Sequence, residues 1–315
     1  MCGCNISEAR LIPVPPKDGS LVSDFLPLLI LLTQLPACVN EYRQRNMPED
    51  VIRDNLRHFK DGISIVKART GTPGIDQTYF NWLVKFIKGT IFHRYGFNFE
   101  ARELPKNIYV LQNRTNGSLV PVLKDTLIHQ SGNILGNAGC TDTENSFITV
   151  FNESETEYTA HPSNNGLIEA NLKVFNKDQY KLILKPGDHV LSVHIPRGAN
   201  ISRQQVIQSF KSGFNDAIKY YPDFSFIAIY CHSWLLDPNL EKLMNPNANI
   251  PQFGKLFTRC PAKSAGTEVF SFIFQRKMPL TDLPENTSLE RAVKEHYING
   301  KFVLAYTGII LPSHL

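Results

Sequence analysis

The fold class is decided by the stretch Lys185-Pro-Gly-Asp-His-Val-Leu-Ser-Val-His-Ile-Pro-Arg-Gly-Ala-Asn-Ile-Ser202 and by the helical pattern that follows it. Lys185–Asp188 is typical of a turn, and the apolar run His189–Ile195 predicts a strand. Pro196–Ile201 then reads as a loop. Ser202 and Gln205 predict a capping box at the start of a long helix. The apolar positions of that helix recur at helical spacing: Val206, Ile207, Phe210, Phe214, Ile218 and Tyr221.

A second apolar strand, Phe224–Tyr230, follows this helix. A strand, a helical crossover and another strand predict two parallel neighbours in one sheet. We expect residues 166–276 to form a single mixed, mostly antiparallel sheet in which only these two strands are parallel. The other expected strands are Asn171–Phe175, Tyr180–Leu184, Phe253–Thr258 and Glu268–Arg276. A helix from about Ser288 to Tyr297 and a tail, Phe302–Leu311, are expected to complete the chain.

The first half of the chain reads as helical and then as strands. Apolar residues at steps of three or four predict helices from Ser23 or Asp24 to Leu35, from Pro48 to Ala68 and from Asp76 to Ile91. Alternation then predicts strands at 95–100 and 107–113, and a polar region at 131–165 holds one short strand, Phe147–Phe151. The expected division is a leader at 1–23, an N-terminal domain at 24–150 and a C-terminal domain at 151–315. The fold class is α+β, that is, mixed α/β.

Composition and charge narrow the function classes. The 315 residues carry 33 basic and 29 acidic side chains, a net charge of +4, which is too mild and too scattered to indicate nucleic-acid binding. Six irregularly spaced cysteines do not resemble a disulfide framework, so we expect reduced thiols in the cytoplasm. No metal is expected, because the pair Cys2-Gly-Cys4 lacks a second Cys/His pair at ligand spacing. The sequence favours no particular oligomeric state.

The most apolar segment is Phe25–Leu32. It is far shorter than the roughly 20 residues that cross a bilayer. Acidic Glu8, Asp18 and Asp24 precede it, which is not typical of a signal peptide. We therefore expect a buried helix there and no membrane span.

Several stretches resemble one family of bacterial proteins, which pairs an N-acyltransferase N-terminal domain with a GNAT-like C-terminal domain. The C-terminal stretches are Leu184–Pro196, Gln208-Ser-Phe210, Cys231-His-Ser-Trp-Leu-Leu-Asp-Pro238 and Asn249-Ile-Pro-Gln-Phe253, and the N-terminal one is Tyr79–Phe99. The resemblance implies an acyltransferase fold and the transfer of an acyl group from acetyl-CoA or another acyl-CoA to a small-molecule acceptor. The acceptor would be an amine or a similar nucleophile.

The resemblance also implies a donor site at the loop between the first strand and the helix. A GNAT loop holds the coenzyme A pyrophosphate with N–H groups at a helix N-terminus. The residues at that place are Arg197, Gly198, Ala199, Asn200, Ile201 and Ser202. Their spacing departs from the usual pattern, which is Arg or Gln, two intervening residues, Gly, one intervening residue, and then Gly or Ala. The alternative is an ordinary strand-to-helix turn with a polar cap.

Two histidines stand at the ends of the expected parallel strands, His194 and His232. In a GNAT-like sheet these strand ends splay apart and the thioester lies between them, so either imidazole could act as general base. Asp237 could orient His232, or it could only cap the short helix after it. Cys231 faces away from His232 on a strand and reads as a buried apolar residue. Ser233 as nucleophile is a minor alternative.

One departure supports a second function. Many GNAT enzymes place a Tyr in the helix after the second strand, where it protonates the departing thiolate. The segment Asn239–Met244 has none, although Tyr230 could substitute. The alternative to an enzyme is therefore a catalytically inactive GNAT-like module that binds acyl-CoA or another small anion.

Overall fold

The computed structural model describes residues 21–71, 73–274 and 278–315, and a six-stranded mixed sheet lies at its centre. The strand order is β1-β2-β13-β14-β16-β15, and only β13 and β14 are parallel, as the crossover predicted. The strands are β1 (Ile91–Arg94), β2 (Phe97–Glu103), β13 (His189–His194), β14 (Ala228–Ser233), β15 (Thr258–Pro261) and β16 (Tyr306–Ile310). The mixed fold class is confirmed.

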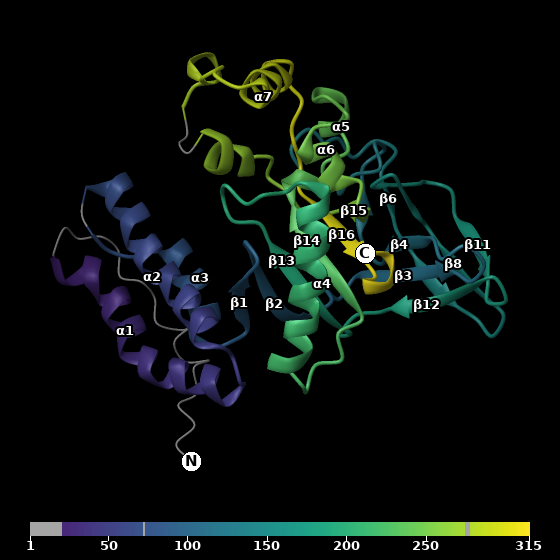
Figure 1. The fold of residues 1–315 in the computed structure, drawn as a ribbon. Coiled ribbons are helices and arrows are strands. Elements are labelled where there is room, and N and C mark those ends of the chain that lie inside the picture. The colour runs from purple at the N-terminus through teal and green to yellow at the C-terminus, as the bar shows by residue number, and fades with distance from the viewer. Residues whose placement is uncertain (1–20, 72, 275–277) are drawn as a thin grey trace.

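Three helices lie together at one end of the molecule, next to β1 (Figure 1). They are α1 (Leu21–Gln44), α2 (Glu49–Thr70) and α3 (Gln77–Ile87). The helical start of the chain is therefore confirmed, although the bounds moved. Asp76 caps α3 as expected, with its carboxylate accepting from Tyr79 N at 2.9 Å. Helix α1 begins before the expected caps Ser23 and Asp24 and continues past Pro36, which lies inside it.

Helix α1 is much longer than the apolar segment Phe25–Leu32 that was compared with a membrane span. Its stretch Phe25–Gln44 is long and apolar enough to cross a bilayer by length and composition, and 28% of its most apolar window is buried inside the protein. The eight-residue length taken from the sequence was therefore wrong. Leu31, Cys38 and Tyr42 of α1 are buried in the core shared with α3, whereas Leu26, Leu29 and Leu32 are exposed, so the expected buried helix is buried along one side only. The absence of a membrane span stays a prediction.

Helix α4 (Arg203–Tyr220) covers one face of the central sheet (Figure 1). Phe210 packs edge-on against Phe97 and Phe99 of β2, with ring centroids 5.3 and 6.4 Å apart. Gly213 allows the closest approach, because a Cβ added there would lie 2.3 Å from the ring of Phe99. Helix α4 is thus fixed to the sheet by aromatic packing and by one missing side chain.

A Gly213→Ala substitution is expected to lower the free energy of unfolding by about 1–3 kcal/mol, because the new methyl group overpacks the contact with Phe99. In an open helix the same change stabilises by up to about 1 kcal/mol, so the sign is diagnostic. Urea unfolding measures it, with Lys211→Ala, an exposed position of α4, as control. A Gly213→Ala protein as stable as the wild type would contradict the packing.

Smaller sheets lie at the opposite end of the molecule from α1–α3 (Figure 1). One three-stranded sheet contains β12, β3 and β4, and the other contains β11, β8 and β7. The strands are β3 (Ile108–Asn113), β4 (Leu119–Leu123), β7 (Phe151–Glu153), β8 (Glu157–Ala160), β11 (Lys173–Asn176) and β12 (Tyr180–Leu184). Two short pairs are β5 (Leu127–Ile128) with β6 (Phe147–Ile148) and β9 (Ser163–Asn164) with β10 (Leu167–Ile168).

The expectation of one sheet over residues 166–276 was therefore wrong. Strands β11 and β12 pair with strands of the smaller sheets, whereas β1 and β2, from the first half of the chain, join the central sheet. The expected strand at 253–258 is α6 (Asn249–Gly254) followed by β15. Residues 268–274 do not form a strand either, because Phe270–Phe274 form a π-helical turn in which the rings of Phe270 and Phe274 are tilted by 40°, with centroids 5.9 Å apart. Residues 275 and 276 of this expected strand lie outside the described residues. The remaining short helices are α5 (Leu240–Leu243) and α7 (Ser288–Ile298).

The expected tail is an interior strand. Residues 306–310 form β16, which lies between β14 and β15 and pairs antiparallel with both. All five of its residues are buried. The predicted domain division at residue 150 stays a prediction, but the central sheet takes strands from both sides of it.

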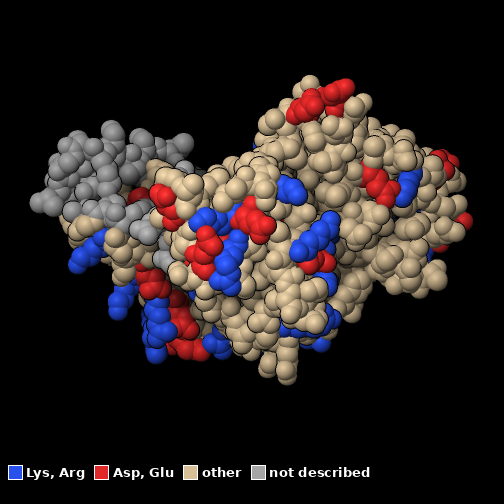
Figure 2. Space-filling model, turned by 90° about the horizontal axis from the view of Figure 1, so that it is seen from above, with Lys and Arg blue, Asp and Glu red and all other residues tan. Residues whose placement is uncertain are grey.

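Charged groups are interspersed on the face that Figure 2 shows, where Lys and Arg lie among Asp and Glu. The mild net charge of +4 is thus not gathered into a basic patch on that face. Within the three described ranges, no group of three His, Cys, Asp or Glu side chains could hold a metal ion. The pair Cys2 and Cys4 lies outside the described residues.

Candidate functional site

The two parallel strands stop pairing at the positions of the two histidines. The register of β13 with β14 runs from Val190–Ala228 to Val193–Cys231 and ends there. Beyond it, β13 still pairs with β2, through His194–Asn98, and β14 still pairs with β16, through His232–Thr307. The next residues, His194 and His232, would have been the next parallel pair. Pairing between the two strands therefore ends just before the two imidazoles, which is where the strands of a GNAT-like sheet are expected to part.

Both histidines belong to the sheet face opposite α4. Cross-strand partners share a face, and side chains alternate along a strand. The partners Glu100 and Ser192, and then Ser192 and Tyr230, thus place His194 and His232 on the face that carries these polar groups. The other face, with Phe97, Phe99 and Val193, packs in the core that contains α4.

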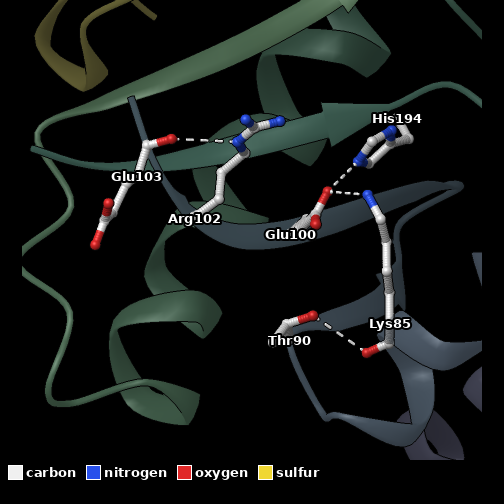
Figure 3. Close-up of polar contacts among 6 residues, drawn as sticks. All are labelled: Lys85, Thr90, Glu100, Arg102, Glu103 and His194. Carbon is white, nitrogen blue, oxygen red and sulfur yellow. Dashed lines mark hydrogen bonds and ion pairs between the residues drawn. The ribbon is translucent and has the colours of Figure 1, made fainter. Parts of the chain in front are cut away.

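Glu100 joins the helical region to the candidate site. His194 Nε2 lies 2.8 Å from Glu100 Oε2, and Lys85 Nζ of α3 donates to the same oxygen at 2.8 Å (Figure 3). Burial alone would raise the pKa of Glu100, but the hydrogen bonds and charges of His194 and Lys85 outweigh it and lower that pKa to about 2. Trp82 of α3 packs edge-on against His194, with centroids 5.0 Å apart. The site therefore contains an ionised carboxylate at neutral pH.

The sequence reasoning missed Glu100 and Lys85. Asn98 and Glu100 were the polar alternates of an apolar strand, which normally face solvent. In the structure they are 3% and 8% exposed, because Lys85 of α3 pairs with Glu100, and His93 of β1 and His58 of α2 bond Asn98. The sequence does show Lys85 near the end of an amphipathic helix and Glu100 on a later strand. That pattern predicts an ion pair only if the helix and the strand are known to pack together.

His232 is open to solvent although protein surrounds it. Its side chain is exposed, yet burial is the largest cause that lowers its pKa. Glu268 opposes this shift, and Arg102 and His194 add to it. The backbone of His232 lies in the β14–β16 pair, and its imidazole has no hydrogen-bond partner among the described residues.

Three further polar side chains lie on this face. The hydroxyl of Tyr230 is 3.4 Å from Thr307 Oγ1, and the guanidinium of Arg102 stacks over the Tyr230 ring at 5.3 Å. Arg102 Nε donates to Glu103 O at 3.2 Å (Figure 3). Tyr230 is therefore near the site, but burial raises its pKa.

The carboxylate of Asp237 bonds backbone N–H groups and neither of the two histidines. Its carboxylate is 1% exposed and accepts from Leu304 N at 2.7 Å and from Asn239 N at 2.8 Å. Burial raises its pKa to about 6, and these two N–H donors oppose the rise. The structure thus shows Asp237 holding the chain before β16 against the turn after β14.

The other polar residues of the motif have structural partners. Ser233 Oγ accepts from Leu235 N at 3.2 Å and caps the turn Trp234–Leu236. Cys231 is fully buried on the α4 face, and burial raises the pKa of its thiol. Trp234 is buried in a cluster with Leu240 and Val293. None of these contacts supports a nucleophile.

The loop before α4 is a tight turn. Ala199 N donates to Pro196 O at 3.1 Å, and Gly198 takes a φ of +77° that favours glycine. Asn200 Oδ1 accepts from Ser202 N at 3.0 Å. Arg197 and Gly198 are exposed, whereas Ala199 and Ile201 pack against the core.

The expected capping box at Ser202 was wrong. The Ser202 hydroxyl makes no cap bond, and Gln205 instead donates to Ser209 Oγ at 2.9 Å. The first-turn N–H groups of α4, at 203–205, accordingly have no acceptor in the part of the chain that the structure describes. Unpaired N–H groups at a helix start attract an anion.

Comparison with known families identifies both parts of the chain. A model of the GNAT-like C-terminal domain matches residues 155–310, and a model of the N-acyltransferase N-terminal domain matches residues 6–89. The chain belongs to the family that pairs these two domains, as the motifs around His194 and His232 indicated. A search of curated protein sequences found no match.

Solved acyltransferase structures share the fold. One is a crystal structure of an acyltransferase in complex with decanoyl-CoA, 18% identical with a TM-score of 0.62. Two others hold CoA and 10C-teicoplanin, and decanoyl-CoA and teicoplanin, at 17% identity and TM-scores of 0.62 and 0.61. Each comparison covers 95% of this chain and 70% of the other.

Proposed function

We propose that this protein is an acyltransferase that uses acyl-CoA as donor and a small-molecule amine or similar nucleophile as acceptor. The observation that carries the proposal is that the pairing of β13 with β14 ends just before His194 and His232, next to a helix start with unpaired N–H groups. The similar acyltransferases in complex with decanoyl-CoA support a donor of that class. Arg197 to Ser202 would hold the pyrophosphate, and the thioester would lie between the strand ends.

The reaction follows from this placement. The acceptor nitrogen attacks the thioester carbonyl carbon, a C–N bond forms and the C–S bond breaks. An imidazole at the strand ends takes the proton that the nitrogen loses, which is general base catalysis. The coenzyme A thiolate leaves and takes up a proton. Teicoplanin in complexes of similar acyltransferases supports an acceptor that is a small molecule.

Two observations favour the second candidate, an inactive module that binds acyl-CoA. The spacing of Arg197, Gly198 and Ala199 departs from the usual phosphate loop, and α5 contains no Tyr to protonate the thiolate. A turnover assay separates the two. Decanoyl-CoA is offered with a panel of small primary amines and teicoplanin, and free coenzyme A thiol and acylated product are measured. If the protein binds decanoyl-CoA but forms no acylated product with any of these acceptors, the inactive module is favoured.

We further propose a cytoplasmic location with reduced thiols. The four cysteines in the described ranges, Cys38, Cys140, Cys231 and Cys260, are free and buried. Free buried thiols are usual in a reducing compartment.

Coenzyme A is expected to raise the melting temperature, because it binds the folded state at the start of α4. Arg197→Glu should abolish that rise by placing a negative charge beside the pyrophosphate. Differential scanning fluorimetry at millimolar coenzyme A measures both. Lys211→Glu makes the same charge change at an exposed site further along α4 and should keep the rise. An unchanged wild-type melting curve would remove the donor assignment.

A further inference from the structure

Lys85, Glu100 and His194 form a connected polar group that reaches from the helical region to the candidate site. Glu100 is 8% exposed and bonds both partners through the same oxygen, at 2.8 Å each (Figure 3). A buried carboxylate is costly unless it is paired. The two side chains that pair with this carboxylate are Lys85 and His194, and His194 is the one that stands at the candidate site.

We propose that Glu100 is a positioning residue that fixes the tautomer and orientation of His194, so that His194 Nδ1 is the general base, and that Lys85 balances the charge of Glu100. The proposal rests on the acyltransferase function proposed above. It gives the helical region a direct part in the chemistry, because Lys85 and Trp82 come from α3.

The tautomer follows from the hydrogen bond. The pKa of Glu100 is about 2, so at neutral pH its carboxylate can only accept. His194 Nε2, at 2.8 Å, must then carry the hydrogen. In a neutral imidazole the other nitrogen has none, so Nδ1 is the atom that can take a proton. The edge contact with Trp82 further restricts the ring.

Lys85 keeps this pair suited to proton transfer. An imidazole beside an unshared carboxylate holds its proton more tightly, because the opposite charge favours the charged form. Lys85 shares the same Glu100 oxygen and reduces that attraction. Other titratable groups on this side are His232 of β14, whose pKa responds to His194, and His93 of β1, which bonds the neighbouring Asn98 at 2.8 Å. His58 of α2 also bonds Asn98 and packs against His93. None of the three supplies a negative charge.

The test uses the full chain, decanoyl-CoA and the most active acceptor of the panel. Glu100→Gln should lower kcat by about 10–100-fold, the range found when the carboxylate partner of a metal-bound histidine is removed. The rise in melting temperature with coenzyme A should persist. Lys85→Met should move the acid limb of the kcat/KM pH profile to higher pH, and Lys85→Arg should restore it. A merely structural role would not move this limb.

A second measurement does not depend on turnover. Nitrogen NMR of histidine-labelled protein, with His194 assigned by its loss in His194→Gln, shows which ring nitrogen carries the hydrogen. We expect the Nε2–H form in the wild type and a mixture of tautomers in Glu100→Gln. Should Glu100→Gln fail to fold, the Lys85→Met profile and the wild-type tautomer decide the question.

The matched control is another partly buried ion pair, Arg259–Glu241, whose atoms are 2.8 Å apart. Glu241→Gln removes a carboxylate of α5 whose ion-pair partners are Arg259 and Lys255 and not a histidine, and it should leave the pH profile unchanged. The proposal is wrong if folded Glu100→Gln and Lys85→Met keep the wild-type kcat and profile, or if wild-type His194 carries its hydrogen on Nδ1. Absence of transfer by the wild type with every acceptor overturns the proposed function instead.

Discussion

Replacing His194 with glutamine is expected to slow acyl transfer by about 10²–10⁴-fold, the usual contribution of a general base. Glutamine keeps a polar group near Glu100 but cannot take the proton of the acceptor. Donor binding should stay near normal, because the start of α4 is unchanged. Single-turnover kinetics with decanoyl-CoA, together with the melting temperature in coenzyme A, measure the two separately.

His232→Gln is the paired variant. His232 stands at the equivalent position on β14 and is exposed without a described partner, so its removal should cost little stability. If His232 is the base, its variant and not His194→Gln shows the large loss of rate. A stable and fully active His232→Gln protein would rule out a catalytic role of His232. Wild-type activity in both variants would rule out either histidine as the general base.

Asp237 is expected to make stability depend on pH. Its pKa is about 6 in the folded protein, against an ordinary value of 3.8. The folded state therefore binds this proton more tightly than the unfolded state does, and raising the pH weakens the folded state. The contribution is fully present below about pH 4 and is lost as pH rises through 6, and it amounts to about 3 kcal/mol, or about 10² in the folding equilibrium constant.

Asp237→Asn removes that titration and keeps the shape. One of the two N–H donors, Leu304 N or Asn239 N, then faces an amide NH₂, which should cost about 1–3 kcal/mol at pH 4. The difference in stability between the two proteins should shrink toward pH 7, as the wild type loses its contribution. Urea unfolding from pH 4 to 7 measures this, and parallel curves for the two proteins would contradict it.

Local pattern predicted the elements whose partners lie nearby in the chain. The three N-terminal helices and the parallel pair around α4 follow from spacing, since a crossover of one helix leaves little freedom. Residues 268–274 failed because an apolar run fits a strand and a buried helix equally well. Their contacts decide for the helix, since Phe270 packs on Phe274 and on Tyr297 of α7.

The sequence pattern predicted the positions of the two candidate histidines but not the residues that contact His194. His194 and His232 stand at the ends of adjacent strands, which follows from the crossover alone. Glu100 and Lys85 depend on β2 joining β13 and on α3 lying where Lys85 reaches β2, and those contacts are distant in the chain. For Asp237 the sequence left open a cap of the short helix or a partner of His232. Its carboxylate accepts from Asn239 N at that turn, and its distant partner, Leu304, precedes a strand that had been expected to be a tail.

The position of β16 has a consequence for how the chain is made. Strand β16, residues 306–310, pairs with both β14 and β15. In the described sheet β14 has β13 as its other neighbour, whereas β15 is an edge strand that pairs with β16 alone. During synthesis on a ribosome, β14 and β15 are made long before these residues emerge, and their apolar edges stay open meanwhile. Such edges are templates for pairing with other chains. A chain that stops before Tyr306 should therefore be recovered as aggregate, and nascent chains should need chaperones until β16 is released.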